Sequence, residues 1–312
     1  MADSQGKIFR KPTAQIEAAM WMVMSGVMFT AHMALGKFLS ESYEPGLLAF
    51  FRSALALVWV APFVSRTSLH RFKTRHFGLI LTRSIFGTIG FLLAFYAYSA
   101  EFGIPLSQFN AISFSRSLFI IVLAALLLKE SVGIRRWVAT AIGFVGVLIM
   151  VRPSGGMELG SFLALGSALC FGGAIILVKS LSKHHSPLIL LTYANLLSTV
   201  LTLPVAIMQW KTPDNLRDGG TIALMALAGV LAQTCYITGM SKGDASFLST
   251  IDYLRLPMTA SVDWLFFQEF PGPLVWLGAL IIVSSTLYIT FREAMKSQRK
   301  PPSGQVNSRE DS

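Results

Sequence analysis

The stretch SQFNAISFSRSLFIIVLAALLLKE, residues 107–130, is long and apolar enough to cross a bilayer, yet it carries Arg116 near its middle. A second stretch, SFLSTIDYLRLPMTASVDWLFFQE, residues 246–269, has the same layout 139 positions later, with Arg255 in register with Arg116. An arginine in hydrocarbon costs at least about 2.5–3.5 kcal/mol, so each arginine should face protein or water. Two embedded charges in one register indicate a repeated architecture.

The composition is that of a membrane protein with several spans. Of the 312 residues 53% are hydrophobic and 13% charged, and the mean hydropathy is +0.59, which excludes an ordinary soluble domain. The net charge of +10 does not indicate a nucleic-acid partner, because the lysines and arginines fall mostly in short segments between apolar runs. Both cysteines lie inside apolar runs, so we expect no disulfide framework, no metal site and no cofactor.

Apolar runs of about 18–23 residues, the length that crosses a bilayer core, predict ten transmembrane helices. The predicted spans are 18–38, 45–65, 77–99, 105–128, 134–151, 159–180, 187–208, 220–240, 246–268 and 272–291. Of the 26 lysines and arginines, 18 fall on the side of the amino terminus, 4 on the opposite side and 4 within spans. Cytoplasmic loops carry the excess of positive charge, so we expect both termini in the cytoplasm and the chain in the cytoplasmic (inner) membrane.

The chain also contains an internal repeat. A shift of 142 positions places Lys37 and Pro45 on Lys179 and Pro187, and a shift of 139 relates the two arginine-bearing stretches. Each half has five spans, and an odd number inverts the second copy relative to the first, a plan typical of secondary transporters. We therefore predict an all-α polytopic protein with a cytoplasmic tail (1–17), two inverted five-helix repeats (18–151 and 159–291) and a disordered cytoplasmic tail (292–312).

Ten spans in two five-helix halves, with apolar helices that end in LLLKE (126–130) and LFFQE (265–269), resemble the drug/metabolite transporter superfamily and its EamA-type transporters in particular. The resemblance covers residues 18–291. In that family a proline commonly bends the fourth helix of each half. Here the second half has Pro257, whereas the first has Leu118.

The resemblance implies alternating access around a central cavity, which would place Arg116 and Arg255 on cavity-lining helices. There one or both would bind a carboxylate, a phosphate or an electron-rich carbonyl of the substrate. The alternative is an interhelical ion pair or a gate. Asp252 lies three residues before Arg255 on nearly the same helical face, so the two can pair, and Asp252 is either a protonatable switch or a structural partner.

Four further polar side chains on the expected cavity helices are candidates for substrate contact. They are Gln108, Tyr98, Tyr236 and Gln233. The amides can instead tie helices together, and the tyrosines can belong to the packed core.

Charged residues nearer the span ends have other expected roles. Glu130 and Glu269 end the fourth helices of the two halves, so they are candidate gates on opposite membrane faces or else solvated helix-end residues. We expect Asp263 to be a rim residue. Arg52 and Arg83 lie about two turns from a span end, where snorkelling can bring a guanidinium to the headgroups.

These features favour a secondary transporter that moves a small organic metabolite across the cytoplasmic membrane. The embedded arginines favour an anionic or zwitterionic substrate, such as an amino acid derivative, and an aromatic vitamin like riboflavin is equally compatible with the resemblance. The alternative is an integral-membrane enzyme that acts on a lipid or isoprenoid, but such an enzyme needs clustered carboxylates, histidines or metal ligands. We therefore expect a transporter and not an enzyme.

Overall fold

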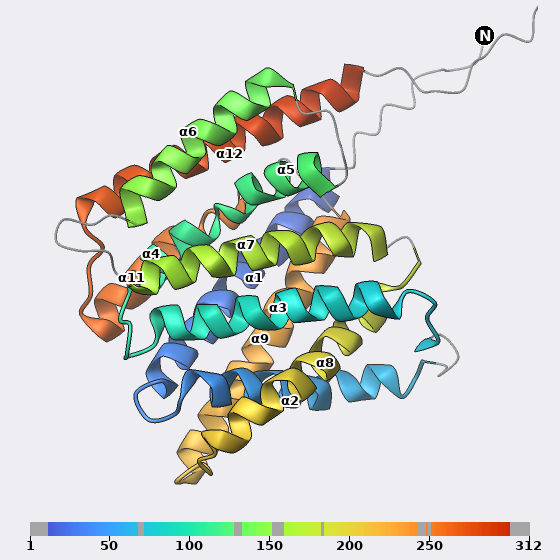
Figure 1. Ribbon diagram of the computed structural model, residues 1–312, viewed down its shortest axis with the longest axis vertical. Coiled ribbons are helices and arrows are strands. Elements are labelled where there is room, and N and C mark those ends of the chain that lie inside the picture. Colours follow the sequence, from blue (N-terminus) through green and yellow to red (C-terminus); the bar gives the residue numbers. More distant parts are fainter. Residues whose placement is uncertain are drawn as a thin grey trace, which may run out of the picture.

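The computed structural model describes residues 12–299 apart from 68–71, 128–132, 152–158, 182–183, 243–247 and 249–250. Within these ranges every regular element is helical (Figure 1). The helices are α1 (Pro12–Leu39), α2 (Pro45–Val64), α3 (Phe77–Tyr98), α4 (Leu106–Ser113), α5 (Arg116–Leu127), α6 (Ile134–Val151), α7 (Leu159–Leu181), α8 (Pro187–Met208), α9 (Leu216–Lys242), α11 (Arg255–Val262), η2 (Asp263–Phe267) and α12 (Pro273–Arg299).

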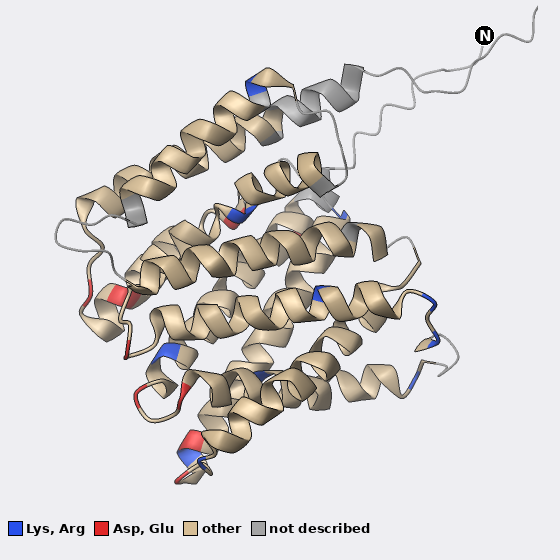
Figure 2. Cartoon of the chain, viewed as in Figure 1, with Lys and Arg blue, Asp and Glu red and all other residues tan. Residues whose placement is uncertain are grey.

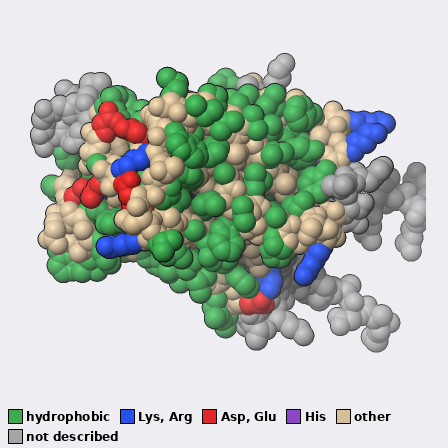
Figure 3. All heavy atoms as spheres, turned by 90° about the horizontal axis from the view of Figure 1, so that it is seen from below, with side chains coloured by type: hydrophobic (Ala, Val, Ile, Leu, Met, Phe, Trp, Pro, Cys, Tyr) green, Lys and Arg blue, Asp and Glu red, His purple; other side chains and the backbone are tan. Residues whose placement is uncertain are grey.

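The length and the apolar surface of the helices suit a lipid bilayer. Seven helical segments in the described ranges are long and apolar enough to cross a membrane, and two shorter apolar stretches, Trp137–Ile149 and Pro273–Ile289, accompany them. Charged residues gather mostly at the helix ends (Figure 2). Apolar side chains cover the middle of the face in Figure 3, and charged ones lie toward its two ends. Such an apolar surface is costly in water and suits a hydrocarbon environment.

The two halves of the chain interdigitate. Helix α1 packs along α9, α2 along α8, α3 along α7 and α6 along α12, so each pair takes one helix from each half. Figure 1 shows α3 beside α7 and α6 beside α12. At the last pair, a Cβ atom on Gly146 would lie 2.9 Å from the carbonyl oxygen of Gly278. The small residue thus lets two backbones approach closely, as is common between membrane helices.

The helices that carry the duplicated arginines are both interrupted. The first breaks at Phe114 and Ser115 between α4 and α5, and the second has a turn at Tyr253 and Leu254 before α11. The tight turn is the same in both, since Ser115 N donates to the Ile112 oxygen (2.9 Å) and Leu254 N to the Ile251 oxygen (3.0 Å).

The two turns also match in register under the 139-residue shift. The first half breaks without a proline. Arg116 and Arg255 are consequently the first residues of α5 and α11.

Two boundaries differ from the sequence-based expectation. Helix α12 continues to Arg299, beyond the predicted span end at residue 291, so the start of the predicted disordered tail is helical. The predicted span 246–268 ends in η2, a turn of π-helix, and stops at Gln268, whose φ of 56° is left-handed. Residues 1–11 and 300–312, which belong to the two predicted tails, lie outside the described ranges.

Candidate functional site

The duplicated arginines meet at a single carboxylate. One oxygen of Asp252 accepts a hydrogen bond from Arg255 Nη2 at 2.9 Å and from Arg116 Nη2 at 3.3 Å. The expected pair within one helix is present, and the arginine of the other half joins it. We call Arg116, Asp252 and Arg255 the central cluster. It links the two halves at their helix breaks.

The central cluster carries an excess of positive charge. One carboxylate faces two guanidinium groups, and the first turns of α5 and α11 add the partial positive charge of helix amino termini. The Arg255 side chain is 7% exposed and that of Asp252 10%, whereas that of Arg116 is 23% exposed. Arg255 Nε is buried and has no partner among the described residues. Arg116 is therefore the member of the cluster that is most free to meet a ligand.

Aromatic rings surround the central cluster. The Arg255 guanidinium lies 5.0 Å from the ring centroid of Phe29 and 5.5 Å from that of Phe114. Phe114 packs edge-to-face against Tyr253, with centroids 4.6 Å apart. These rings hold the guanidinium by cation–π attraction and offer flat apolar surface next to a hydrogen-bonding edge. A ligand that combines a planar ring with polar atoms would match both properties.

The other predicted contacts divide into two groups. Tyr236 on α9 lies close enough to interact electrostatically with Asp252 and both arginines, so it borders the central cluster. Tyr98 instead packs against Phe95 and Phe109, with ring centroids 5.6 and 5.2 Å away.

The two amides differ from the tyrosines. Gln108 donates a hydrogen bond to the Ser161 hydroxyl at 2.9 Å, so it joins α4 to α7, which was the alternative to substrate contact. Gln233 is partly buried, and no hydrogen bond within the described ranges joins it to the central cluster.

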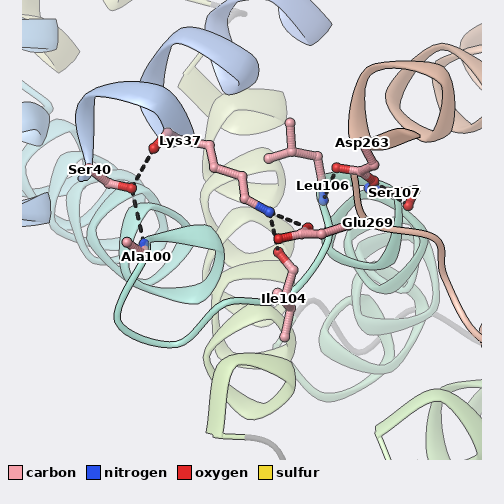
Figure 4. Close-up of polar contacts among 8 residues, drawn as sticks. All are labelled: Lys37, Ser40, Ala100, Ile104, Leu106, Ser107, Asp263 and Glu269. Atoms are coloured by element: carbon pink, nitrogen blue, oxygen red, sulfur yellow. Dashed lines mark hydrogen bonds and ion pairs between the residues drawn. The ribbon is translucent and has the colours of Figure 1, made fainter. Parts of the chain in front are cut away.

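A second polar group closes the end of the molecule where α1 finishes (Figure 4). Lys37 forms an ion pair with Glu269 and also donates to the Ile104 oxygen at 3.5 Å. The Lys37 side chain is 7% exposed and that of Glu269 32%, so the pair is more than a solvated helix end. We call these three residues the Lys37 cluster. Glu130, the other candidate gate, lies outside the described residues.

The expectation that Asp263 is a rim residue is wrong. Asp263 is fully buried and accepts hydrogen bonds from Leu106 N (2.8 Å), Ser107 N (2.7 Å) and the Ser107 hydroxyl (Figure 4). The first amides of α4 have no partner within their own helix, and this carboxylate from the other half satisfies two of them. Nothing in the sequence signalled the contact, because the partners are more than 150 positions apart.

The expectation that Arg52 snorkels is also wrong. Arg52 is 8% exposed, and its guanidinium lies 3.4 Å from the centroid of the Phe91 ring. Arg83 is partly exposed, although its Nε atom is buried without a partner in the described structure. Arg52 is buried because it lies on a helical face that points into the protein, and the distance of a residue from the span end does not show which way its side chain points.

Comparison with known proteins gives consistent matches over the chain. The profile of the EamA-like transporter family matches residues 16–152 and again residues 158–291. A riboflavin transporter of Vibrio cholerae serotype O1 is 32% identical over 293 residues, which cover 91% of this chain and 96% of that protein. A riboflavin transporter of Rhizobium johnstonii is 31% identical, with coverages of 96% and 98%. An S-adenosylmethionine uptake transporter of Rickettsia felis is 29% identical, with coverages of 90% and 94%.

The fold also occurs in a solved crystal structure. The two superpose with a TM-score of 0.61 at 13% sequence identity, over 91% of this chain and 99% of the other. At that identity the likeness concerns the fold alone.

Proposed function

Because the chain belongs to the EamA-like transporter family, we propose that it is a secondary transporter that moves a small organic metabolite across the cytoplasmic membrane by alternating access. The family and the named relatives are transporters, so the membrane-enzyme alternative has no support. In this proposal the chain crosses the membrane ten times as two inverted five-helix repeats, 18–151 and 159–291. Both termini are cytoplasmic, as the distribution of lysine and arginine favours.

The central cluster is the proposed substrate site, and one observation carries this proposal: two arginines from inverted halves share one carboxylate at two helix breaks. Interrupted helices whose amino termini point at an anionic substrate group recur in secondary transporters. When no substrate is bound, the Asp252 carboxylate forms ion pairs with both arginines. A substrate carboxylate or carbonyl would take its place at Arg116, whose bond to Asp252 is the longer of the two.

The proposed gate is the Lys37 cluster together with the contact between Asp263 and α4. Both join segments of opposite halves, so the halves cannot move apart at this end while the contacts persist. With the amino terminus in the cytoplasm, this end faces the outside. Opening to the outside then requires the Lys37–Glu269 pair and the two amide hydrogen bonds of Asp263 to break together.

The substrate class follows from the rings beside the arginines. Phe114 and Tyr253 offer flat surface within reach of the guanidinium groups, which suits a planar heteroaromatic compound with hydrogen-bond acceptors. Two of the relatives are named riboflavin transporters and one an S-adenosylmethionine uptake transporter, and both of these compounds belong to this class. We place flavins first, as riboflavin or its phosphate ester, and S-adenosylmethionine second.

The test is uptake by proteoliposomes that contain the purified chain. Riboflavin and S-adenosylmethionine are supplied separately, with and without a proton gradient, and empty liposomes are the control. The proposal expects one of the two compounds to accumulate only in the protein-containing vesicles. If neither accumulates under any gradient, and a mixed metabolite pool screened by mass spectrometry also yields no transported solute, the transporter proposal fails.

A further inference from the structure

Among the described residues, neither Arg52 nor Arg83 has a carboxylate partner. Arg52 on α2 lies close enough to Tyr98 and to Arg83, both on α3, to interact electrostatically with each, and neither arginine forms an ion pair or a hydrogen bond with any described residue. Both have a buried Nε atom that no described residue binds. Two like charges in a medium of low polarity repel each other and each loses its hydration, so such a pair is costly unless something else compensates it.

The Phe91 ring fixes the orientation of the Arg52 guanidinium, whose buried Nε atom makes no hydrogen bond with any described residue. The face of the guanidinium lies on the Phe91 ring at 3.4 Å from its centroid. Phe91 in turn packs edge-to-face against Phe171 of α7, with centroids 4.9 Å apart. A guanidinium that is stacked on one face presents its N–H groups at the edge, in the planar fork that matches a carboxylate or a phosphate.

Arg52 also belongs to the interior near the central cluster. His32, which interacts electrostatically with Arg52, lies three positions after Phe29, the residue on which Arg255 stacks. On α1 this spacing corresponds to about 4.5 Å along the helix axis. On α7, Gly172 follows Phe171 and lies against the central cluster, since a Cβ atom on Gly172 would be 3.3 Å from the Arg116 backbone oxygen. Phe91 and Phe171 therefore connect the Arg52 side chain with the segment that carries Arg116.

We propose that Arg52, supported by Arg83 and by the Phe91 ring, forms a second subsite that binds an oxyanion, a carboxylate or a phosphate, of the transported molecule. The inference rests on the proposed transport function and adds a second contact to the site at the central cluster. An oxyanion at the Arg52 edge would fill the free N–H groups and offset the repulsion between the two arginines. The ring on the other face would keep the fork aligned.

The test compares two compounds that differ only in a phosphate group, riboflavin and riboflavin 5′-phosphate. Their dissociation constants are measured by flavin fluorescence in a maltoside detergent, which carries no phosphate, so that lipid headgroups cannot supply the anion. We expect the unmodified protein to bind the phosphate ester at least about 10-fold more tightly, which corresponds to one charged hydrogen-bonding contact. Inorganic phosphate and acetate, added as competitors, separate a phosphate site from a carboxylate site.

The decisive variant is Arg52→Gln, which should bring the two dissociation constants within about 2-fold of each other, while the exposed Arg135→Gln leaves their ratio unchanged. If Arg52→Gln does not assemble, Arg83→Gln must narrow the same ratio. An unchanged ratio overturns the inference, and so does an unmodified protein that binds none of riboflavin 5′-phosphate, inorganic phosphate and acetate. A phosphate preference without transport in vesicles would instead overturn the proposed function and leave the subsite in place.

Discussion

Substitution of Asp252 by asparagine tests how the central cluster binds its ligand. Asp252→Asn keeps the size of the side chain and removes the charge that two guanidinium groups share at 2.9 and 3.3 Å. Loss of one partner from a buried ion pair costs about 3–5 kcal/mol. Arg116 is partly exposed, so we expect the lower end of that range for the ligand-free protein.

The same substitution should tighten ligand binding. If substrate displaces Asp252 from Arg116, the aspartate competes with the ligand, and its removal releases a charged hydrogen bond of roughly 1.5–3 kcal/mol. Because each 1.4 kcal/mol is a factor of ten, affinity should rise about 10- to 150-fold. Transport should slow at the same time, since the empty site can no longer re-form the pair that joins the two halves.

The assay measures thermal unfolding and ligand dissociation constants for the purified protein in detergent, and uptake in vesicles. Asp214→Asn is the matched control, because Asp214 is 58% exposed and pairs with Lys211 at the surface. The control should change none of the three quantities appreciably. Weaker binding by Asp252→Asn, together with unchanged stability, would refute the competition and would mean that Asp252 contacts the ligand directly.

Three further outcomes are expected. Lys37→Met or Glu269→Gln should shift the protein toward the state that is open at the outer end and slow transport several-fold, which spin-label distances and uptake would measure. A double variant that exchanges the two charges should restore the closed state. If neither single variant shifts the spin-label distances, the Lys37–Glu269 pair is not a gate. Gly146→Ala should lower the free energy of unfolding by about 1–3 kcal/mol, because the added methyl group meets the backbone of α12. Gly87→Ala, with open space around the added methyl group, should not destabilise the protein. Equal changes in the free energy of unfolding would contradict the packing argument. Burial lowers the pKa of His185 below its usual 6.5, so the folded loop favours the neutral imidazole. The free energy of local opening around His185, obtained from hydrogen exchange corrected for the intrinsic pH dependence of the amide rates, should fall as the pH drops below about 6.5 and stay constant above; an opening free energy independent of pH would contradict this.

Much of the fold could be predicted because lipid leaves few alternatives. Long apolar runs must be helices where water is absent, and the boundaries of most described helices agree with the apolar runs to within a few residues. The interruption of the helix before Arg116 was harder to predict. It occurs without a proline, so only its likeness to the turn before Arg255 in the other half identifies it.

The site was predictable where partners are close in sequence or related by the repeat. Arg255 and Asp252 are one helical turn apart, and the register of the repeat singled out Arg116. Asp263 and Arg52 were misjudged, because their partners come from distant helices and depend on the face that each side chain presents. Sequence position gives depth in the membrane with some accuracy, but it does not give rotation about the helix axis.

Uptake by Arg116→Gln tests the central claim most directly, since this arginine is the more exposed of the two and its loss should leave the fold intact. The variant and the exposed control Arg135→Gln are reconstituted at matched protein content with whichever solute the unmodified chain transports. The account predicts that Arg116→Gln lowers uptake at subsaturating substrate by about 10-fold or more and lowers the unfolding temperature only modestly, since Arg255 still pairs with Asp252, while the control transports normally and unfolds at the temperature of the unmodified protein. Normal uptake by Arg116→Gln would contradict the account.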